Sequence, residues 1–470
     1  MINKIFLIFT IILFIFSSVS SQTHSTTLKN QEEVFVTIYN VNLGLIKDIR
    51  KLKIPRGEIE LQFKDVASKI DPTTVHIKSL TFPQSLQILE QNYEYDLLSP
   101  NKLFEKYIGQ EVILISVDPK TKEKREKAIL LSTNQGKIYK IGQRIVINHP
   151  GRVEFPKLPE NLIAQPTLVW LLKNEYSKQQ KIEVSYLTEG INWKADYVAV
   201  LNKDDTKIDL TGWVTIENRS GTTYYQANLK LVAGEVQRVQ PELIRRRREM
   251  VMYEAKAAPP RFEEKEFFEY HIYTLNRPTT INHNQTKQMN LLTVNEIPVK
   301  KEFIFEGKQY YYFSRYGEIE KNEKVSVYLN IANKKENNLG IPLPKGIVRV
   351  YKEDYQGQLQ FIGENRIDHT PKDEKIKIKI GKAFDVVATR KQTEYKRISD
   401  KVHESSFKIS IRNHKKEDII VNVVEPVYGE WEVLESNFNY EKVDISTLKF
   451  TVPVKKDSES ILKYRIRITY

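Results

Sequence analysis

The side chains that could carry out catalysis or bind a metal ion are few and scattered in this chain. It contains 8 histidines, none at a metal-ligand spacing such as H-x-x-x-H, and no cysteine. A thiol nucleophile is therefore excluded, and a zinc site would need carboxylate ligands in place of thiolates. The sequence also lacks a G-x-S-x-G nucleophile elbow, a P-loop and a dinucleotide-binding fingerprint. From these patterns we predict no catalytic residue, no metal site and no cofactor.

One short stretch, Asp368-His369-Thr370-Pro371, resembles a fragment of a catalytic site. Adjacent residues of an extended segment point to opposite faces, so Asp368 and His369 should not act on the same substrate. Pro371 marks a turn. We therefore interpret this stretch as structural.

An enzyme that acts on sugars would be harder to identify from the sequence than the enzymes with a local motif considered above. Glycoside hydrolysis needs two carboxylates, which strands far apart in the sequence could supply, and nothing selects two of the 60 acidic residues. Tyr224-Tyr225 and Tyr310-Tyr311-Tyr312 could offer stacking surfaces for sugar rings. Aromatic residues are favoured in strands for packing reasons alone, however, so this signal is not specific.

Four consecutive arginines, Arg245, Arg246, Arg247 and Arg248, form a dense positive cluster. They lie in residues 237–261, which show no strand periodicity and which we interpret as a mobile loop. The arginines could be a protease-processing site or could bind an anionic ligand. We favour a third interpretation, a solvated charge cluster in a flexible loop.

Strand periodicity dominates the chain from Glu33 to the C-terminus. The last segment, Leu462–Thr469, alternates apolar and charged residues, which is typical of an antiparallel sheet with one buried face. A single short helix is expected, with Ser99 as its N-cap, Pro100 at its first position and Gly109 at its end. We predict an all-β fold of antiparallel β-sandwich domains with very little helix.

The spacing of the strands predicts three domains. Residues 22–160 form an N-terminal β domain, in which five short strands over residues 109–156 predict a small SH3-like or OB-like barrel insert. Such a barrel could bind a peptide or an oligomer, or it could be purely structural. A central β-sandwich is expected over residues 161–345, interrupted by the loop 237–261, and an immunoglobulin-like β-sandwich over residues 346–470.

The first 21 residues resemble a secretory signal peptide. Lys4 supplies a positive charge, Ile5–Phe16 is apolar except for Thr10, and small residues follow over Ser17–Ser21. The apolar run is shorter than the about 20 residues that span a bilayer, so a cleaved signal is favoured over a membrane anchor. No later segment resembles a membrane span, and without cysteine the mature chain is not a lipoprotein. We expect a periplasmic or secreted protein.

The charge balance indicates the kind of partner. The formal net charge is +13, from 73 Lys and Arg against 60 Asp and Glu. A basic excess of this kind favours attraction to anionic polymers or to a negatively charged envelope surface. Neither a dense basic stripe nor a known nucleic-acid-binding module is present, so we expect no nucleic-acid partner. The expected partners are an envelope polysaccharide or an envelope protein.

Several separate blocks between residues 160 and 470 carry a family resemblance. They include Glu189-Gly190-Ile191-Asn192-Trp193, Leu210-Thr211-Gly212-Trp213, Tyr270-His271-Ile272-Tyr273-Thr274-Leu275, Gly346-Ile347-Val348-Arg349-Val350-Tyr351, Ile367-Asp368-His369-Thr370-Pro371 and Glu425-Pro426-Val427-Tyr428-Gly429. These blocks resemble a secreted bacterial domain of unknown function that is shared with proteins called mucoidy inhibitor A. The resemblance implies an exported, β-rich protein with no assigned reaction, and the mucoidy name hints at a link to envelope polysaccharide. It identifies no catalytic residue. The arginine-rich loop departs from the Ala-, Met- and Pro-rich stretch expected there.

Two functional hypotheses follow. The first is an exported, non-enzymatic protein that binds or scaffolds a component of the cell envelope. The alternative is a polysaccharide-active enzyme that uses carboxylates from distant strands.

The export signal predicts a defined mature N-terminus. If the signal is cleaved after its small residues, N-terminal sequencing of the protein purified from its native host should begin at Ser21 or Gln22. Cell fractionation should then find the protein outside the inner membrane. An intact Met1 together with tight membrane association would show instead that Ile5–Phe16 is an anchor.

Overall fold

The computed structural model describes residues 22–94, 96, 98–118, 121–159, 162–163, 165–234, 236–237, 262–267 and 270–470. The expected signal segment 1–21 and Arg245–Arg248 lie outside these residues. The described ranges hold thirty strands, the helix α1 (Pro100–Lys106) and four 3-10 helices, which confirms the all-β prediction. The 3-10 helices are η1 (Leu28–Asn30), η2 (Pro72–Thr74), η3 (Gln309–Tyr312) and η4 (Lys335–Asn337). None of these helices has the length and apolarity needed to cross a bilayer.

Two sheets pack against each other in the N-terminal part of the molecule. The first has the order β1 (Gln22–Thr26), β4 (Gly57–Lys64), β12 (Thr167–Asn174) and β6 (Leu86–Glu94). The second has the order β17 (Phe262–Phe267), β18 (Tyr270–Leu275), β16 (Tyr224–Ala233), β2 (Gln31–Tyr39), β3 (Leu43–Lys53), β13 (Gln179–Glu189) and β5 (His76–Ser79), and β19 (Thr279–Ile281) pairs with β16. Phe63 and Trp170 of the first sheet share one hydrophobic core with Val36 and Ile182 of the second.

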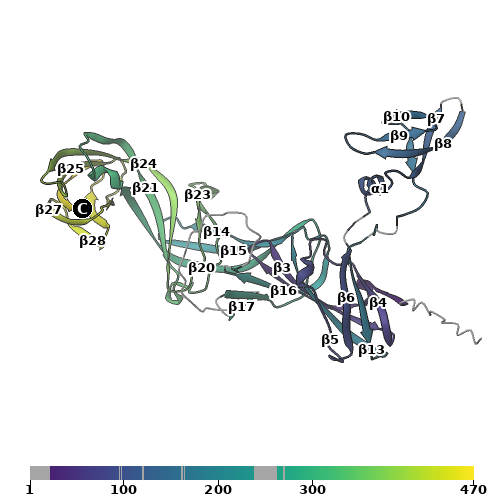
Figure 1. Ribbon diagram of the computed structural model, residues 1–470. Coiled ribbons are helices and arrows are strands. Elements are labelled where there is room, and N and C mark those ends of the chain that lie inside the picture. The colour runs from purple at the N-terminus through teal and green to yellow at the C-terminus, as the bar shows by residue number, and fades with distance from the viewer. Residues whose placement is uncertain are drawn as a thin grey trace, which may run out of the picture.

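A third, larger sheet runs from the middle of the molecule to its C-terminal end (Figure 1). Its main order is β23 (Leu359–Ile367), β22 (Gly346–Glu353), β14 (Ile191–Leu201), β15 (Lys207–Asn218), β20 (Gln285–Glu306), β21 (Glu318–Ala332), β24 (Lys375–Arg397), β25 (Val402–Asn413), β30 (Ser458–Thr469) and β27 (Glu430–Ser436). Three further strands lie off this path: β26 (Ile419–Pro426) pairs with β20 and with β29 (Thr447–Val454), and β28 (Tyr440–Asp444) pairs with β29.

The long strands of this sheet belong to two hydrophobic cores. In β20, Leu291 lies in the first core and Phe305 in the second. In β24, Ile378 lies in the first core and Val386 in the second. The cores therefore meet along continuous strands and not at a linker. Residues 346–353, at which the sequence placed the start of a separate domain, form β22, which pairs in parallel with β14 of the central region.

The insert expected over residues 109–156 forms a five-stranded sheet. Its order is β10 (Arg144–Ile147), β9 (Ile138–Ile141), β8 (Thr121–Ser132), β7 (Glu111–Asp118) and β11 (Arg152–Glu154). As predicted, five short strands are present, but no pairing joins β10 to β11 in the described part of the insert. The sheet is therefore open, and the SH3-like or OB-like barrel expected over residues 109–156 does not close. Phe104 and Tyr107, at the end of α1, pack over Leu130 on one face of the sheet.

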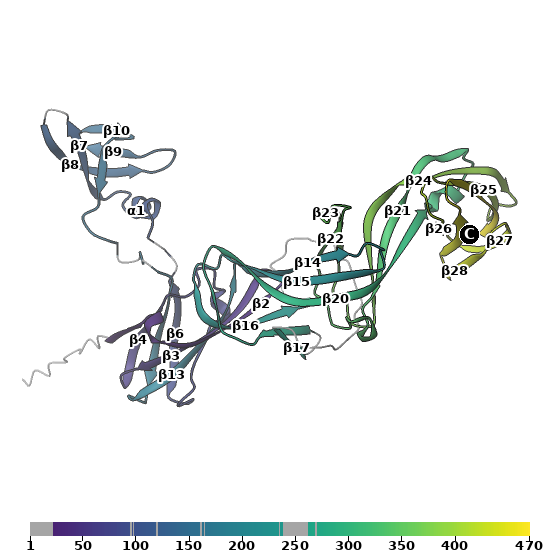
Figure 2. The same ribbon diagram turned by 180° about the vertical axis from the view of Figure 1, so that it is seen from behind.

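The insert stands apart from the rest of the molecule in both ribbon views (Figures 1 and 2). It leaves the body between β6 and β12, two neighbouring antiparallel strands of the first sheet. The predicted helix cap is confirmed, because the Ser99 side chain accepts a hydrogen bond from the backbone N–H of Lys102.

Four strand pairs of the described chain are parallel, namely β1 with β4, β16 with β2, β14 with β22 and β20 with β26. Three of the four sheets are therefore mixed and not purely antiparallel. The reason is that segments distant in the sequence return to lie beside one another, which alternation along a single strand does not reveal.

The strand pairing predicts how the protein responds to trypsin. Arg245–Arg248 offers trypsin consecutive cleavage sites in a segment without strand pattern. The flanking strands β16 and β18 pair with each other in one sheet. Limited trypsin treatment should therefore cut within Arg245–Arg248, and the two fragments should co-elute in size-exclusion chromatography. Fragments that separate without denaturant would contradict the shared sheet.

Candidate functional site

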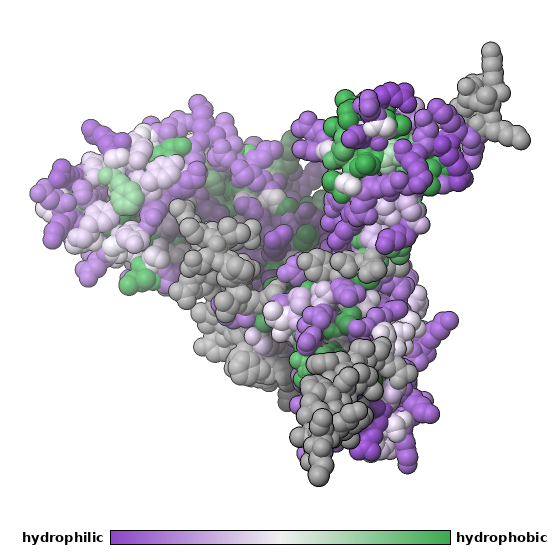
Figure 3. Space-filling view, turned by 45° about the vertical axis from the view of Figure 1, so that its right-hand side comes forward, coloured by the Kyte–Doolittle hydropathy of each residue, from purple (hydrophilic) through white to green (hydrophobic). Residues whose placement is uncertain are grey.

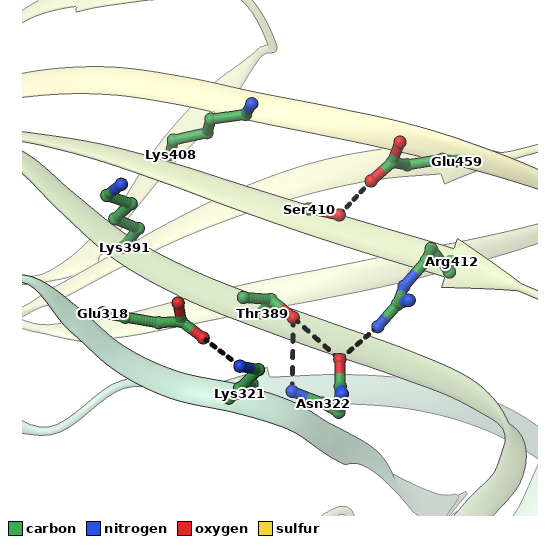
Figure 4. A pocket seen from close by; sticks show the side chains of 9 residues that line it. All are labelled: Glu318, Lys321, Asn322, Thr389, Lys391, Lys408, Ser410, Arg412 and Glu459. Atoms are coloured by element: carbon green, nitrogen blue, oxygen red, sulfur yellow. Dashed lines mark hydrogen bonds and ion pairs between the residues drawn. The ribbon is translucent and has the colours of Figure 1, made fainter.

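A polar groove lies on the outer face of the C-terminal half of the large sheet. It has a volume of about 290 Å³ and crosses β21, β24, β25 and β30 (Figure 4). Its lining residues are Glu318, Lys321, Asn322, Thr389, Lys391, Lys408, Ser410, Arg412 and Glu459. Strand alternation explains this face: Lys391 and Lys408 are exposed, whereas their neighbours Arg390 and Ile409 are buried on the other side.

Three lysines lie directly opposite one another across this face. Lys391 of β24 pairs with Lys408 of β25, and Lys408 pairs in turn with Lys463 of β30. We call these three residues the lysine row. All three are exposed, and no carboxylate of the described chain forms an ion pair with any of them. Like charges directly opposite each other destabilise a sheet, so the lysine row is an unfavourable arrangement in the free protein.

The lysine row connects two grooves. Lys408 lines the polar groove and also a second groove of about 580 Å³, which includes Lys463, Ser436 and Asn437. The row therefore presents positive charge along a continuous path over three neighbouring strands. Adjacent strands lie about 4.8 Å apart, so the backbone positions that carry the three lysines are spaced at a similar interval.

The other charged side chains of the polar groove form ion pairs or hydrogen bonds with neighbouring side chains. Glu318 lies 3.8 Å from the ammonium of Lys321, and the Ser410 hydroxyl donates a hydrogen bond to Glu459 (Figure 4). Arg412 donates from Nη2 to the amide oxygen of Asn322, while its Nε is buried without a partner among the described residues. The acidic side chains are thus engaged, and the charges of this groove without an ion pair among the described residues are those of Lys391, Lys408 and Arg412.

The structure does bring two carboxylates together from distant strands. Glu320 of β21 and Glu425 of β26 both form ion pairs with Arg390 of β24, and the Arg390–Glu425 distance is 2.7 Å. The Tyr312 hydroxyl donates to the other oxygen of Glu425 at 3.0 Å. Arg390 and Glu425 are both 0% exposed. Burial raises the pKa of Glu425, and the adjacent Arg390 opposes this shift. A substrate cannot reach this cluster, so its role is structural.

A family model described as a domain of unknown function, DUF4139, matches residues 182–470. The chain belongs to the DUF4139 family. The DUF4139 region contains the lysine row and the buried Arg390 cluster, whereas the insert lies before it. No curated protein matches the chain.

The Asp368-His369 stretch of the DUF4139 region does not form a catalytic pair. Nδ1 of His369 accepts a hydrogen bond from the backbone N–H of Lys345 at 3.3 Å, and Nε2 lies 3.2 Å from the amide nitrogen of Asn40. Asp368 is exposed. Burial and, next, the charge of Lys345 lower the pKa of His369 to about 4, so the ring is neutral at pH 7. His369 links the end of β2 to residues 345–370, and it is not activated by Asp368.

The other candidates from the sequence are dispersed. Tyr224, Tyr311 and Tyr312 are buried, whereas Tyr225 and Tyr310 are exposed but do not line either groove. Within the described ranges, no cluster of histidine and acidic side chains could hold a metal ion. Arg245–Arg248 fall outside those ranges.

Sequence reasoning missed the lysine row. Each lysine occupies an outward position in an alternating strand, and many solvated lysines do the same. Only the register, which places residues 391, 408 and 463 opposite one another, distinguishes these three. No signal within a single strand could have identified them.

Adjacent residues on opposite faces of β24 allow a matched test of the buried cluster. Arg390→Ala leaves Glu320 and Glu425 without their counter-charge, and removing one partner of a buried pair costs about 3–5 kcal/mol. Urea denaturation followed by tyrosine and tryptophan fluorescence should show this loss. The control Lys391→Ala should change stability little, because Lys391 is exposed and no carboxylate among the described residues forms an ion pair with it. Equal stability of the two variants would contradict a structural role for Arg390.

Proposed function

We propose that this protein is an exported, non-enzymatic binding protein that holds an anionic polymer of the cell envelope on the lysine row. The single observation that carries the proposal is the register of Lys391, Lys408 and Lys463 across three adjacent strands. An acidic polymer laid across the strands would place its negative groups over the row. Binding would then relieve the repulsion among the lysines, so an acidic polymer would bind the row more tightly than a neutral polymer does.

The chemistry of the two grooves supports a binding role. Hydroxyl and amide side chains, among them Thr389, Ser410 and Asn437, lie beside the lysines and can bond to sugar hydroxyls. The basic excess of the whole chain, +13, would assist long-range attraction to an acidic polymer. The signal-like residues 1–21 and the resemblance to mucoidy inhibitor A proteins support an envelope location and a link to envelope polysaccharide.

The alternative, a polysaccharide-active enzyme, gains no support from the site. The carboxylates that meet from distant strands, Glu320 and Glu425, surround Arg390 inside the second core. None of the nine residues that line the polar groove is aromatic, so it lacks a stacking surface for a sugar ring. Binding without turnover is therefore the function that we propose.

The proposal predicts binding to a polyuronate. Purified protein should bind polygalacturonate in isothermal titration calorimetry and should not bind neutral dextran of similar length. Binding should weaken as salt is raised, because exposed charges are screened. The triple variant Lys391→Gln, Lys408→Gln, Lys463→Gln should lose about tenfold or more in affinity at low salt, since it removes every charge of the row.

The matched control carries the same change in net charge at another place. Lys47, Lys53 and Lys230 are exposed lysines on β3 and β16 of another sheet. Their triple change to Gln should leave polygalacturonate binding close to that of the unmodified protein. Equal losses in the two triple variants would show nonspecific attraction, and absence of binding by the unmodified protein would overturn the proposal.

A further inference from the structure

We infer that the inserted five-stranded sheet is a second binding surface, which docks on an anionic lipid bilayer. This surface is separate from the lysine row and goes beyond the function proposed above. It lies on the face of the insert opposite to α1, and we call it the aliphatic face. Its residues are Ile129 and Leu131 of β8, Ile138 and Lys140 of β9, and Ile145 and Ile147 of β10.

The strand register places these side chains next to one another. Lys140 lies opposite both Ile145 and Ile129, and Ile147 lies opposite Ile138. The intervening residues Leu130 and Tyr139 point the other way, into the small core beneath α1. Alternation along the strands therefore accounts for both faces of the inserted sheet. α1 covers one face, and the other remains at the surface.

The aliphatic face is exposed to an unusual degree for its composition. Ile145 and Ile147 are 58% and 67% exposed, and Ile129 and Leu131 beside them are also exposed. Hydrophobic residues are visible at the surface of the insert in the space-filling view (Figure 3). Single exposed aliphatic residues are ordinary, but neighbouring ones on a single sheet face mark a site of interaction.

The charge around this face selects an anionic partner. Residues 98–159 contain twelve Lys and Arg against six Asp and Glu. Lys140 is exposed at the centre of the face and has no ion-pair partner in the described chain. Lys127, on the same side of β8, is paired only with Glu111, at 2.7 Å. Aliphatic side chains with interspersed lysines match a lipid surface, in which the chains enter the apolar boundary and the ammonium groups meet acidic headgroups.

The position and composition of the face favour a bilayer over a protein partner. The insert extends away from the body, so a flat surface can approach it without contacting the large sheets (Figures 1 and 2). The face consists of Ile, Leu and Lys, and it lacks the Trp and Tyr residues that are enriched among the hot spots of protein interfaces. Lysine and aliphatic residues are instead typical of peripheral membrane contacts.

Sedimentation with lipid vesicles tests the inference on the full mature chain. Vesicles of three parts phosphatidylcholine and one part phosphatidylglycerol should carry the protein into the pellet, and vesicles of phosphatidylcholine alone should not. Ile145→Ser with Ile147→Ser should lower the vesicle affinity about tenfold or more, because two exposed aliphatic side chains no longer enter the lipid. Lys127→Gln with Lys140→Gln should lower it as well, and provides a second variant that leaves the aliphatic residues in place.

Two controls separate this surface from others. Ile88→Ser with Leu89→Ser changes aliphatic residues of β6 that are 43% and 42% exposed, and it should leave vesicle binding unchanged. The lysine-row triple variant should also bind vesicles normally. Loss of vesicle binding in that variant, with retention in both variants of the aliphatic face, would overturn the inference and assign lipid binding to the row. Failure of the unmodified protein to bind anionic vesicles would overturn it too, whatever the result with polygalacturonate.

Discussion

The structure depends on strands that are long enough to belong to two hydrophobic cores. β20 and β24 contain 22 and 23 residues, and each gives side chains to both cores. A continuous strand cannot bend sharply without losing ladder hydrogen bonds, so the central and C-terminal regions are joined by a sheet and not by a hinge. Two of the register shifts between β21 and β24, at Lys324/Ser326 and Val327/Tyr328, occur where the cores meet, and such bulges allow a strand to change direction while pairing continues.

Charge lies on both faces of β24, with opposite consequences. Arg390 points into the second core, where Glu320 and Glu425 form ion pairs with it and accept hydrogen bonds from tyrosine hydroxyls. Lys391, the next residue, points outward. It lies opposite Lys408 on one side and Glu318 on the other, and no ion pair joins it to a described carboxylate. The buried charge is compensated and fixed in place, whereas the outer charge is uncompensated and accessible. A ligand can respond only to the second, which is why we associate function with the outer face.

The two proposed surfaces lie on different parts of the chain. The lysine row is within the DUF4139 region, residues 182–470, and the aliphatic face is on the insert that precedes it. One surface is polar and suits a hydrated acidic polymer, and the other is aliphatic with isolated lysines and suits a lipid boundary. A protein with both could hold an acidic polymer close to a membrane. The insert reaches its position through one pair of antiparallel strands, β6 and β12, and it keeps its own small core beneath α1.

Much of the local structure could be predicted from the sequence, because local structure depends on local pattern. Alternation identified β30 and assigned its buried face, and the Ser99–Pro100 pair identified α1.

The tertiary structure alone decided which strands became neighbours. Period-two alternation states that Lys391, Lys408 and Lys463 point outward, but hydrogen bonding between strands places them opposite one another. The alternation of the sequence likewise could not show that Arg390 is buried. An arginine enters a core only when distant carboxylates such as Glu320 and Glu425 meet it there. The sequence thus determined the class of fold and the faces of its strands, whereas both proposed surfaces arise from contacts between segments that are far apart in the chain.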